Sequence, residues 1–249
     1  MKRYLAEMMA LPLYPLLAWQ GQRTRKMTPR LPEASGPCHG TCRPEHPTPQ
    51  RFRLLSIGES PVAGVGVNNH QEAITAQFAQ TLARQYDVNV EWQAFGQNGA
   101  DLALALASML PKLPCCFPAI DLVLIAFGVN DTTAFRSVTR YRRELHGILD
   151  AVMQQLKPKQ ILLSGVPPVH AFPALPQPLR MVLGTKAAAL DQVAIDVAEK
   201  YSQVMHVPMH FDVKDHSLMA HDGFHPSAKG VQLWAMQLLK VFERNWCEK

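Results

Sequence analysis

The spacing of apolar positions from residue 51 onward predicts strands and helices that alternate along the chain. Short apolar runs are typical of buried strands, whereas apolar residues three and four positions apart indicate helices. The predicted strands are Arg53–Gly58, Val88–Phe95, Leu122–Phe127, Gln160–Ser164 and Val204–Met209. The predicted helices are Glu72–Tyr86, Ala100–Leu110, Ser137–Leu156, Met181–Tyr201 and Ser227–Trp246. This alternation indicates an α/β domain with a parallel sheet, because parallel neighbours need long crossover connections.

The polarity of the strands also predicts their order in the sheet. Val88–Phe95 alternates apolar and polar residues, as a half-exposed edge strand does, whereas the first, third and fourth strands are apolar on both faces. We therefore expect a three-layer flavodoxin-like fold, in which a five-stranded parallel sheet of order 2-1-3-4-5 is flanked by helices.

Residues 1–50 have a different pattern, and we expect an N-terminal apolar segment and a Pro-rich arm there, before a domain of residues 51–249. Eight of the 20 prolines lie in this region, and Pro29–Pro49 shows no sustained apolar period, which predicts an irregular arm. Before it, Leu5–Trp19 is mostly apolar and follows two basic residues, as in a signal peptide. However, an acidic residue and two prolines interrupt the stretch, and it is shorter than the roughly 20 residues of a spanning helix.

The residues that follow the apolar stretch favour a segment that is not cleaved. No Ala-x-Ala site follows it, and the dense bases Arg23, Arg25, Lys26 and Arg30 oppose export. We expect the segment to pack on the domain or to make peripheral contact with a membrane surface. A cytoplasmic or membrane-peripheral location is accordingly favoured over secretion.

The positive charge of the chain is concentrated in the same region. Of the formal net charge of +5, residues 1–50 contribute +4, with seven bases and three acids, so the remainder of the chain carries +1. A nearly neutral domain has no broad basic face with which to neutralise phosphates, so we expect no nucleic-acid partner.

Polar clusters follow four of the predicted strands, at the edge where open α/β sheets build their sites. They are Gly58-Glu59-Ser60, Asn98-Gly99-Ala100, Gly128-Val129-Asn130-Asp131 and Asp222-Gly223-Phe224-His225. Together they offer a hydroxyl nucleophile, backbone donors, an amide and an Asp/His pair, which are the groups that acyl transfer needs. A serine hydroxyl is a weak nucleophile until a base takes its proton, and Asp222 can orient the ring of a histidine three residues later.

In order and separation these four clusters resemble the motifs of the SGNH (GDSL-like) hydrolase family. Gly58-Glu59-Ser60 departs from the family's Gly-Asp-Ser by Glu for Asp, and we expect Glu59 to hold the turn after the first strand. The resemblance covers residue 51 to the C-terminus. It implies a serine esterase with the triad Ser60, His225 and Asp222. It also implies an oxyanion hole formed by the N–H groups of Ser60 and Gly99 and the side-chain amide of Asn130, with Gly96 as the alternative to Gly99.

Other interpretations remain open at this point. His216 or His221 could replace His225 as the base, although neither has Asp three positions before it. An α/β-hydrolase would need Gly-x-Ser-x-Gly, and position 62 is Val62. A flavodoxin-like binding or receiver module, with Asp131 or Glu59 accepting a metal or phosphoryl group, is the main alternative from another class. A catalytically inactive interaction protein is the third.

Protein groups fill every catalytic role, so we expect neither a cofactor nor a metal. The metal-like pair Cys38-x₃-Cys42 lacks a second matching pair. The spacing His206-x₃-His210 suits metal binding on a helix, but these residues lie on a predicted strand. The expected partner is a small-molecule carboxylic ester, lipid-like or short-chain. The apolar N-terminus and the segment Val166–Arg180, which carries five prolines and Phe172, favour lipid-like acyl esters, because the segment would line the site with apolar side chains.

Overall fold

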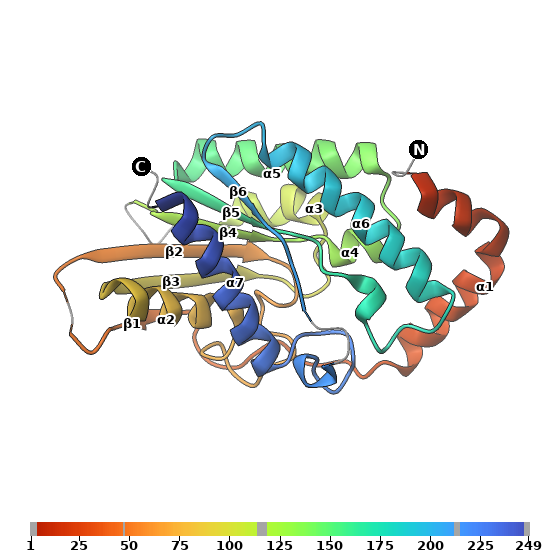
Figure 1. The fold of residues 1–249 in the computed structure, drawn as a ribbon, viewed down its shortest axis with the longest axis horizontal. Coiled ribbons are helices and arrows are strands. Elements are labelled where there is room, and N and C mark those ends of the chain that lie inside the picture. Colours follow the sequence, from red (N-terminus) through yellow and green to blue (C-terminus); the bar gives the residue numbers. More distant parts are fainter. Residues whose placement is uncertain (1–3, 47, 114–118, 212–214, 247–249) are drawn as a thin grey trace.

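The five apolar strand segments and one further strand assemble into a six-stranded sheet at the centre of the molecule (Figure 1). The structure is a computed structural model and describes residues 4–46, 48–113, 119–211 and 215–246. The strands are β1 (His39–Cys42), β2 (Arg51–Gly58), β3 (Asn89–Gly96), β4 (Leu122–Ala126), β5 (Gln160–Ser164) and β6 (Val204–Val207). Their order across the sheet is β1-β3-β2-β4-β5-β6.

The predicted five-stranded, all-parallel sheet is wrong in strand number and order, because β1 adds a sixth strand at the edge, next to β3. Strand β1 pairs antiparallel with β3, from His39 opposite Gln93 to Cys42 opposite Val90, whereas all other neighbouring strands are parallel. The sheet is therefore mixed, and β3 is not at its edge. The arm predicted to be irregular supplies this edge strand, although its side chains show no strand periodicity, because ladder pairing uses backbone groups. The boundary at residue 51 stays a prediction.

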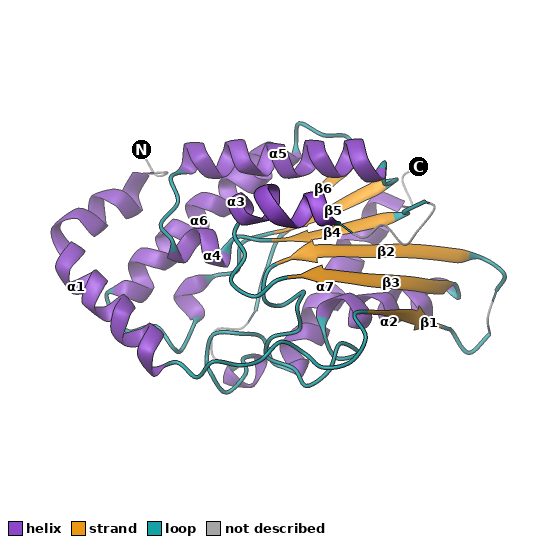
Figure 2. Cartoon of the chain, turned by 180° about the vertical axis from the view of Figure 1, so that it is seen from behind, coloured by secondary structure: helices purple, strands orange, loops and turns teal. Residues whose placement is uncertain are grey.

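Helices cover both faces of the sheet and bury a separate apolar cluster on each (Figure 2). Helices α2 (Ile74–Tyr86) and α7 (Ala228–Trp246) pack on one face, where Phe78, Trp92 and Phe242 are fully buried. Helices α5 (Val138–Leu156) and α6 (Leu179–Ala198) cover the other face. The α/β class with flanking helices is confirmed.

The segment predicted as one helix over Ala100–Leu110 is instead three short helical pieces. They are α3 (Leu102–Leu104), a π-helical turn (Ala105–Met109) and a 3₁₀ turn (Leu110–Lys112). The carboxylate of Asp101 caps α3 by accepting the N–H of Leu104 at 2.9 Å. This cap fixes the chain just after the predicted cluster Asn98-Gly99-Ala100. The N–H of Leu102 also donates to the Asp131 carboxylate on α4 (Val129–Thr133), so the two loops lie side by side.

The N-terminal apolar stretch forms helix α1 (Leu5–Met27), which packs against α6. It continues through Pro12 and Pro15 and ends eight residues beyond Trp19. In Figure 2 the arrowheads of β2 and β3 point toward the end of the molecule where α1 lies. The helix therefore stands near the carboxyl ends of the strands, where the polar clusters converge.

Candidate active site

A chain of hydrogen bonds links Ser60, His225 and Asp222, although the first is 165 residues from the second. Ser60 follows β2, and its Oγ lies 3.0 Å from Nε2 of His225. The other ring nitrogen, Nδ1, lies 2.6 Å from Oδ2 of Asp222. A serine, a histidine within reach of its hydroxyl, and a buried carboxylate behind the histidine form the arrangement of a nucleophile, its base and an orienting group.

The short turn before α7 holds the Asp222 carboxylate in its charged form. Oδ1 accepts the N–H groups of Phe224 and His225 at 2.9 and 3.0 Å, and Gly223 between them has φ +64°. Burial alone would raise the pKa of Asp222, but the hydrogen bonds from the His225 ring and from the two N–H groups outweigh it and lower this pKa. The site therefore holds a permanent negative charge behind the imidazole, where it can stabilise an imidazolium.

The two alternative bases lie away from Ser60. His216 and His221 are both exposed, and the described hydrogen bonds place neither ring beside the hydroxyl. Of these three histidines, His225 is the one with a described hydrogen bond to the Ser60 hydroxyl.

Glu59, the residue that departs from the family's Gly-Asp-Ser motif, holds Asn130 in place. Oε1 of Glu59 accepts the N–H of Val129 at 2.9 Å, and Oε2 accepts the N–H of Asn130 at 3.0 Å. The side-chain Nδ2 of Asn130 lies 2.5 Å from Oε2 of Glu59 and 2.9 Å from the carbonyl of Ala100. The sequence predicts a structural role for Glu59 in the turn after the first strand, and in the structure its carboxyl group ties the loop after β2 to the loop after β4.

Burial strongly affects the ionisation of Glu59. Desolvation raises its pKa from 4.5 to about 8, although three N–H donors favour the charged form. Asp131, which is also buried and accepts the N–H of Leu102, has its pKa raised to about 7, mainly by desolvation. At neutral pH the group beside the Asn130 amide is thus mostly the uncharged acid.

The raised pKa of Glu59 predicts a pH-dependent stability. Between pH 4.5 and about 8 the folded protein holds a proton that the unfolded chain releases, so the free energy of unfolding should fall as pH rises, by at most about 1.4 kcal/mol per pH unit. Glu59→Gln should start less stable, because its amide NH₂ faces N–H donors, but should lack this contribution. In urea unfolding at pH 5, 6.5 and 8, the gap between wild type and variant should therefore shrink as pH rises. Parallel pH curves would contradict the prediction.

Backbone donors are available beside Ser60. Within the described residues, no backbone carbonyl accepts the N–H of Ser60 or of Gly99. Gly99 has φ +79°, a conformation that favours glycine, and it lines the same cleft as Asn130 and His225. Gly96 instead packs against the chain after Ser60, since a Cβ there would stand 2.2 Å from the N of Ala63. The role of Gly96 is close packing, which leaves Gly99 as the glycine that faces the cleft.

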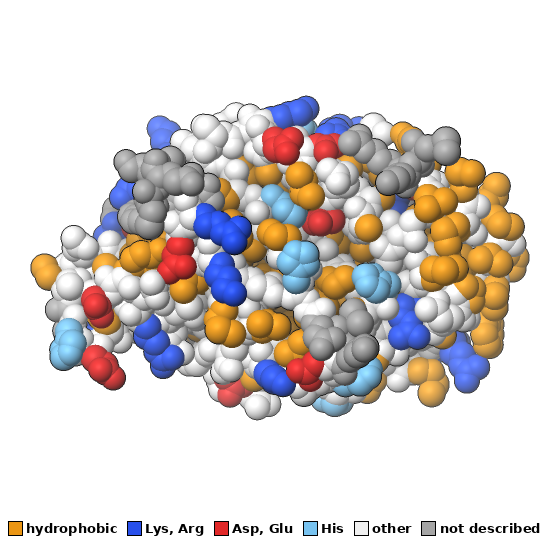
Figure 3. Space-filling view, in the orientation of Figure 1, with side chains coloured by type: hydrophobic (Ala, Val, Ile, Leu, Met, Phe, Trp, Pro, Cys, Tyr) orange, Lys and Arg blue, Asp and Glu red, His pale blue; other side chains and the backbone are white. Residues whose placement is uncertain are grey.

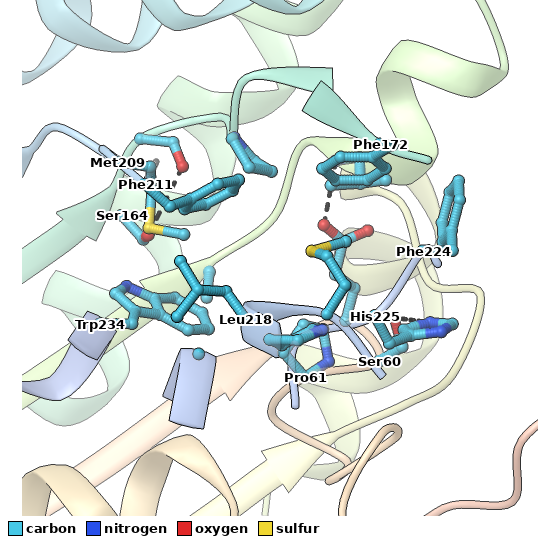
Figure 4. Close-up of a pocket in the computed structure, with 18 of the residues that line it drawn as sticks. Ser60, Pro61, Ser164, Phe172, Met209, Phe211, Leu218, Phe224, His225 and Trp234 are labelled. Atoms are coloured by element: carbon cyan, nitrogen blue, oxygen red, sulfur yellow. Dashed lines mark hydrogen bonds between the residues drawn. The ribbon is translucent and has the colours of Figure 1, made fainter. Parts of the chain in front are cut away.

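An almost wholly apolar pocket opens beside Ser60. Figure 4 shows Ser60 and His225 at one end and Met209, Phe211 and Trp234 at the other. Phe172, from the Pro-rich segment after β5, packs edge-on against Phe224 with ring centroids 5.1 Å apart. The expectation that this segment lines the site with apolar side chains is thereby met at Phe172. The pocket suits an apolar group bonded to the atom that Ser60 attacks.

The described residues do not support a metal site or a receiver-type acid cluster. No group of three or more His, Cys, Asp and Glu among them is arranged to hold a metal. His206 instead bonds Asp191, with Nε2 and Oδ1 2.9 Å apart. Glu59 and Asp131, the two acids a receiver would use, are buried and already accept backbone N–H groups.

Comparisons with known proteins identify the family of the chain. The GDSL-like Lipase/Acylhydrolase family matches residues 56–233, more than half of the chain, whereas no curated protein matches. Solved structures with a similar fold include the lipase Lip_vut3 from a goat rumen metagenome (13% identity, TM-score 0.60, covering 76% of this chain and 97% of that one). TesA (22%, 0.58, 77% and 98%) and a lipase/acylhydrolase from Enterococcus faecalis (19%, 0.52, 78% and 96%) are also similar. The chain therefore belongs to the GDSL-like lipase/acylhydrolase family and is an ester-hydrolysing enzyme.

Proposed function

We propose that the protein hydrolyses carboxylic esters with an apolar acyl chain, through an acyl-enzyme on Ser60. The observation that carries the proposal is the hydrogen-bonded chain Ser60–His225–Asp222 at the mouth of an apolar pocket. Such a chain supplies a nucleophile with its base, and the pocket offers room for a hydrocarbon group but few polar partners for a sugar.

The first half of the reaction acylates the serine. As Ser60 Oγ bonds to the carbonyl carbon, its proton passes to Nε2 of His225, and the carbonyl oxygen becomes an oxyanion. Collapse of this intermediate breaks the bond to the alcohol oxygen, which leaves with the proton from His225. The charge of Asp222 stabilises the imidazolium while it exists.

The second half repeats these steps with water. His225 takes a proton from a water molecule, whose oxygen attacks the acyl-enzyme, and Ser60 recovers its proton as the carboxylic acid departs. In both halves the oxyanion would be bound by the N–H groups of Ser60 and Gly99 and by the amide of Asn130. These donors carry no formal charge, so they stabilise a transient anion without binding one permanently.

A fluorophosphonate probe tests the nucleophile directly. We expect the probe to add to Ser60, to be detected by mass spectrometry of the peptide containing it, and to block hydrolysis of p-nitrophenyl butyrate. Wild type preincubated with that substrate should label more slowly. Labelling of another residue, or none in active protein, would overturn the proposal.

The apolar pocket predicts a preference for longer acyl chains. Each methylene buried in the pocket contributes about 0.8 kcal/mol, or roughly fourfold in kcat/KM, until the pocket is full. We expect kcat/KM to rise from p-nitrophenyl acetate to longer esters. Met209→Trp, which fills the end opposite Ser60, should move the optimum to shorter chains.

Met236→Trp is the matched control, because Met236 is an exposed methionine on α7 outside the pocket. It should keep the wild-type chain-length profile. A profile that is flat in wild type, or equally shifted in both variants, would show that the pocket does not hold the acyl chain.

A further inference from the structure

Helix α1 exposes an apolar face that no described part of the chain covers. Of the ten exposed large hydrophobic side chains among the described residues, eight lie between Tyr4 and Met27. Leu11 is 80% exposed, Met8 66% and Trp19 54%. Figure 3 shows hydrophobic side chains gathered over the end of the molecule that α1 occupies. Such a concentration on one helix marks an interaction surface, because single exposed apolar residues are usually scattered.

The opposite face of α1 is fixed to the domain. The side chain of Gln20 donates to the carbonyl of Gln177 at 2.7 Å and accepts the N–H of Leu179 at 3.1 Å. Lys186, wholly buried on α6, forms an ion pair with Glu7. These contacts hold α1 with Ala6 and Leu17 toward the domain. The fold therefore fixes the orientation of the outward apolar face.

The outward face changes from apolar to basic along the helix. Arg23 and Lys26 follow Trp19 by four and seven positions, which places them on the same side, and both are exposed. The Arg23 guanidinium lies 5.4 Å from the centre of the Trp19 ring. No acidic residue occurs between Glu7 and Glu33. An apolar helix face that continues into cations and an aromatic ring is complementary to the acyl and headgroup layers of an anionic membrane.

One edge of the outward face of α1 borders the catalytic cleft, and the exposed Leu11 lies at this edge. Leu11, Tyr14 and Leu17 line one cleft together with Asn130 and His225. Contact of the outward face with a surface would therefore bring the mouth of this cleft to the same surface.

Insertion across a bilayer does not explain this face. Within the residues that the structure describes, no helix combines the length and apolar character needed to span a membrane. The side chains of α1 instead suit a helix that lies in the plane of the interface.

We propose that α1 docks the protein on the surface of bilayers that contain anionic phospholipid. Met8, Leu11 and Trp19 enter the boundary between headgroups and acyl chains, and Arg23 and Lys26 contact the anionic headgroups. Docking itself needs no catalysis. Its role in delivering acyl esters from the membrane to Ser60 rests on the proposed function.

Vesicle flotation of the full chain tests the docking surface. We expect wild type to float with vesicles of phosphatidylcholine and phosphatidylglycerol, and far less with phosphatidylcholine alone. Met8→Ser/Trp19→Ser should weaken binding by roughly tenfold or more, since two large apolar side chains no longer enter the interface. Arg23→Gln/Lys26→Gln should reduce binding to anionic vesicles by a similar factor and make it less sensitive to salt.

Two controls separate docking from folding and catalysis. Met236→Ser removes an exposed methionine on α7, away from α1, and should float like wild type. All variants should retain wild-type kcat/KM on a water-soluble p-nitrophenyl ester, because none of the substituted residues lines the cleft. An enzyme that binds vesicles but hydrolyses no ester would overturn the proposed function and leave docking intact.

A measurement without a destabilising variant completes the test. Brominated phosphatidylcholine, mixed with phosphatidylglycerol, should quench part of the tryptophan fluorescence of Trp246→Phe but little of that of Trp19→Phe/Trp246→Phe, since the two tryptophans left in the latter, Trp92 and Trp234, are buried. No flotation, equal quenching in both proteins, or binding unchanged in Met8→Ser/Trp19→Ser would overturn the proposal. So would a wild-type dimer, without vesicles, that this variant converts to monomer, since the face would then join two copies of the chain.

Discussion

Ser60→Ala is expected to lower kcat for ester hydrolysis by about 10⁴-fold or more, because no other group can form the acyl-enzyme. His225→Ala should have an effect of similar size, since an unassisted hydroxyl is a poor nucleophile. The two groups act as one unit, so the double variant should be little worse than either single variant. The measurement is the initial rate with p-nitrophenyl butyrate at enzyme concentrations high enough to detect the residual rate.

The fold should survive both changes. Among the described residues, the Ser60 hydroxyl has one hydrogen-bond partner, the His225 ring, and that ring is partly exposed. Circular dichroism of both variants, and the midpoint of urea unfolding of Ser60→Ala, should therefore remain close to wild type. His221→Ala, in the same loop but exposed, is the matched control and should keep full activity. If Ser60→Ala kept a tenth of the wild-type rate, or if His221→Ala were the inactive variant, the proposed triad would be wrong.

The positions of Ser60, Asp222 and His225 could be predicted because they depend on regular parts of the fold. Buried parallel strands are recognisable as apolar runs, and their carboxyl ends must meet at one edge of a sheet. Ser60 follows β2 and Asn130 follows β4, so strand order alone brings their loops together. The Asp222–His225 contact is local, since three residues at a turn suffice to bring the carboxylate to the ring.

Features that depend on the backbone or on long-range packing could not be predicted in this way. Strand β1 pairs through main-chain groups, and Gly40 within it lies against the ring of Trp92, a contact that no periodicity encodes. Helix α1 continues to Met27 through two prolines because α6 holds its inner face. The bonds from Glu59 to Val129 and Asn130 span about 70 positions, so only the fold shows what the Glu in the nucleophile motif contacts.

Asn130→Ala is expected to lower kcat by about 10²–10³-fold with little change in KM, which is the usual effect of removing one oxyanion donor. The substrate carbonyl carries little charge before attack, so the amide contributes mainly in the transition state. In the resting site Nδ2 lies within 2.5 Å of Glu59 and 2.9 Å of the carbonyl of Ala100, which occupy both amide hydrogens. The oxyanion must therefore share a hydrogen with one of these acceptors.

The raised pKa of Glu59, about 8, makes that sharing easier at neutral pH. An uncharged carboxyl group competes weakly for the amide hydrogen, whereas the carboxylate would compete strongly and would repel the oxyanion. Competition for the amide hydrogen and repulsion of the oxyanion both weaken transition-state binding once Glu59 ionises. In wild type, kcat should therefore decline as pH rises through about 8. In Asn130→Ala the competition is absent, and the decline should become shallower, with only the repulsion left. Full pH profiles of kcat for the two proteins provide the measurement. A variant impaired mainly in KM, or one with an unchanged decline at high pH, would mean that Asn130 positions the substrate and does not bind the oxyanion.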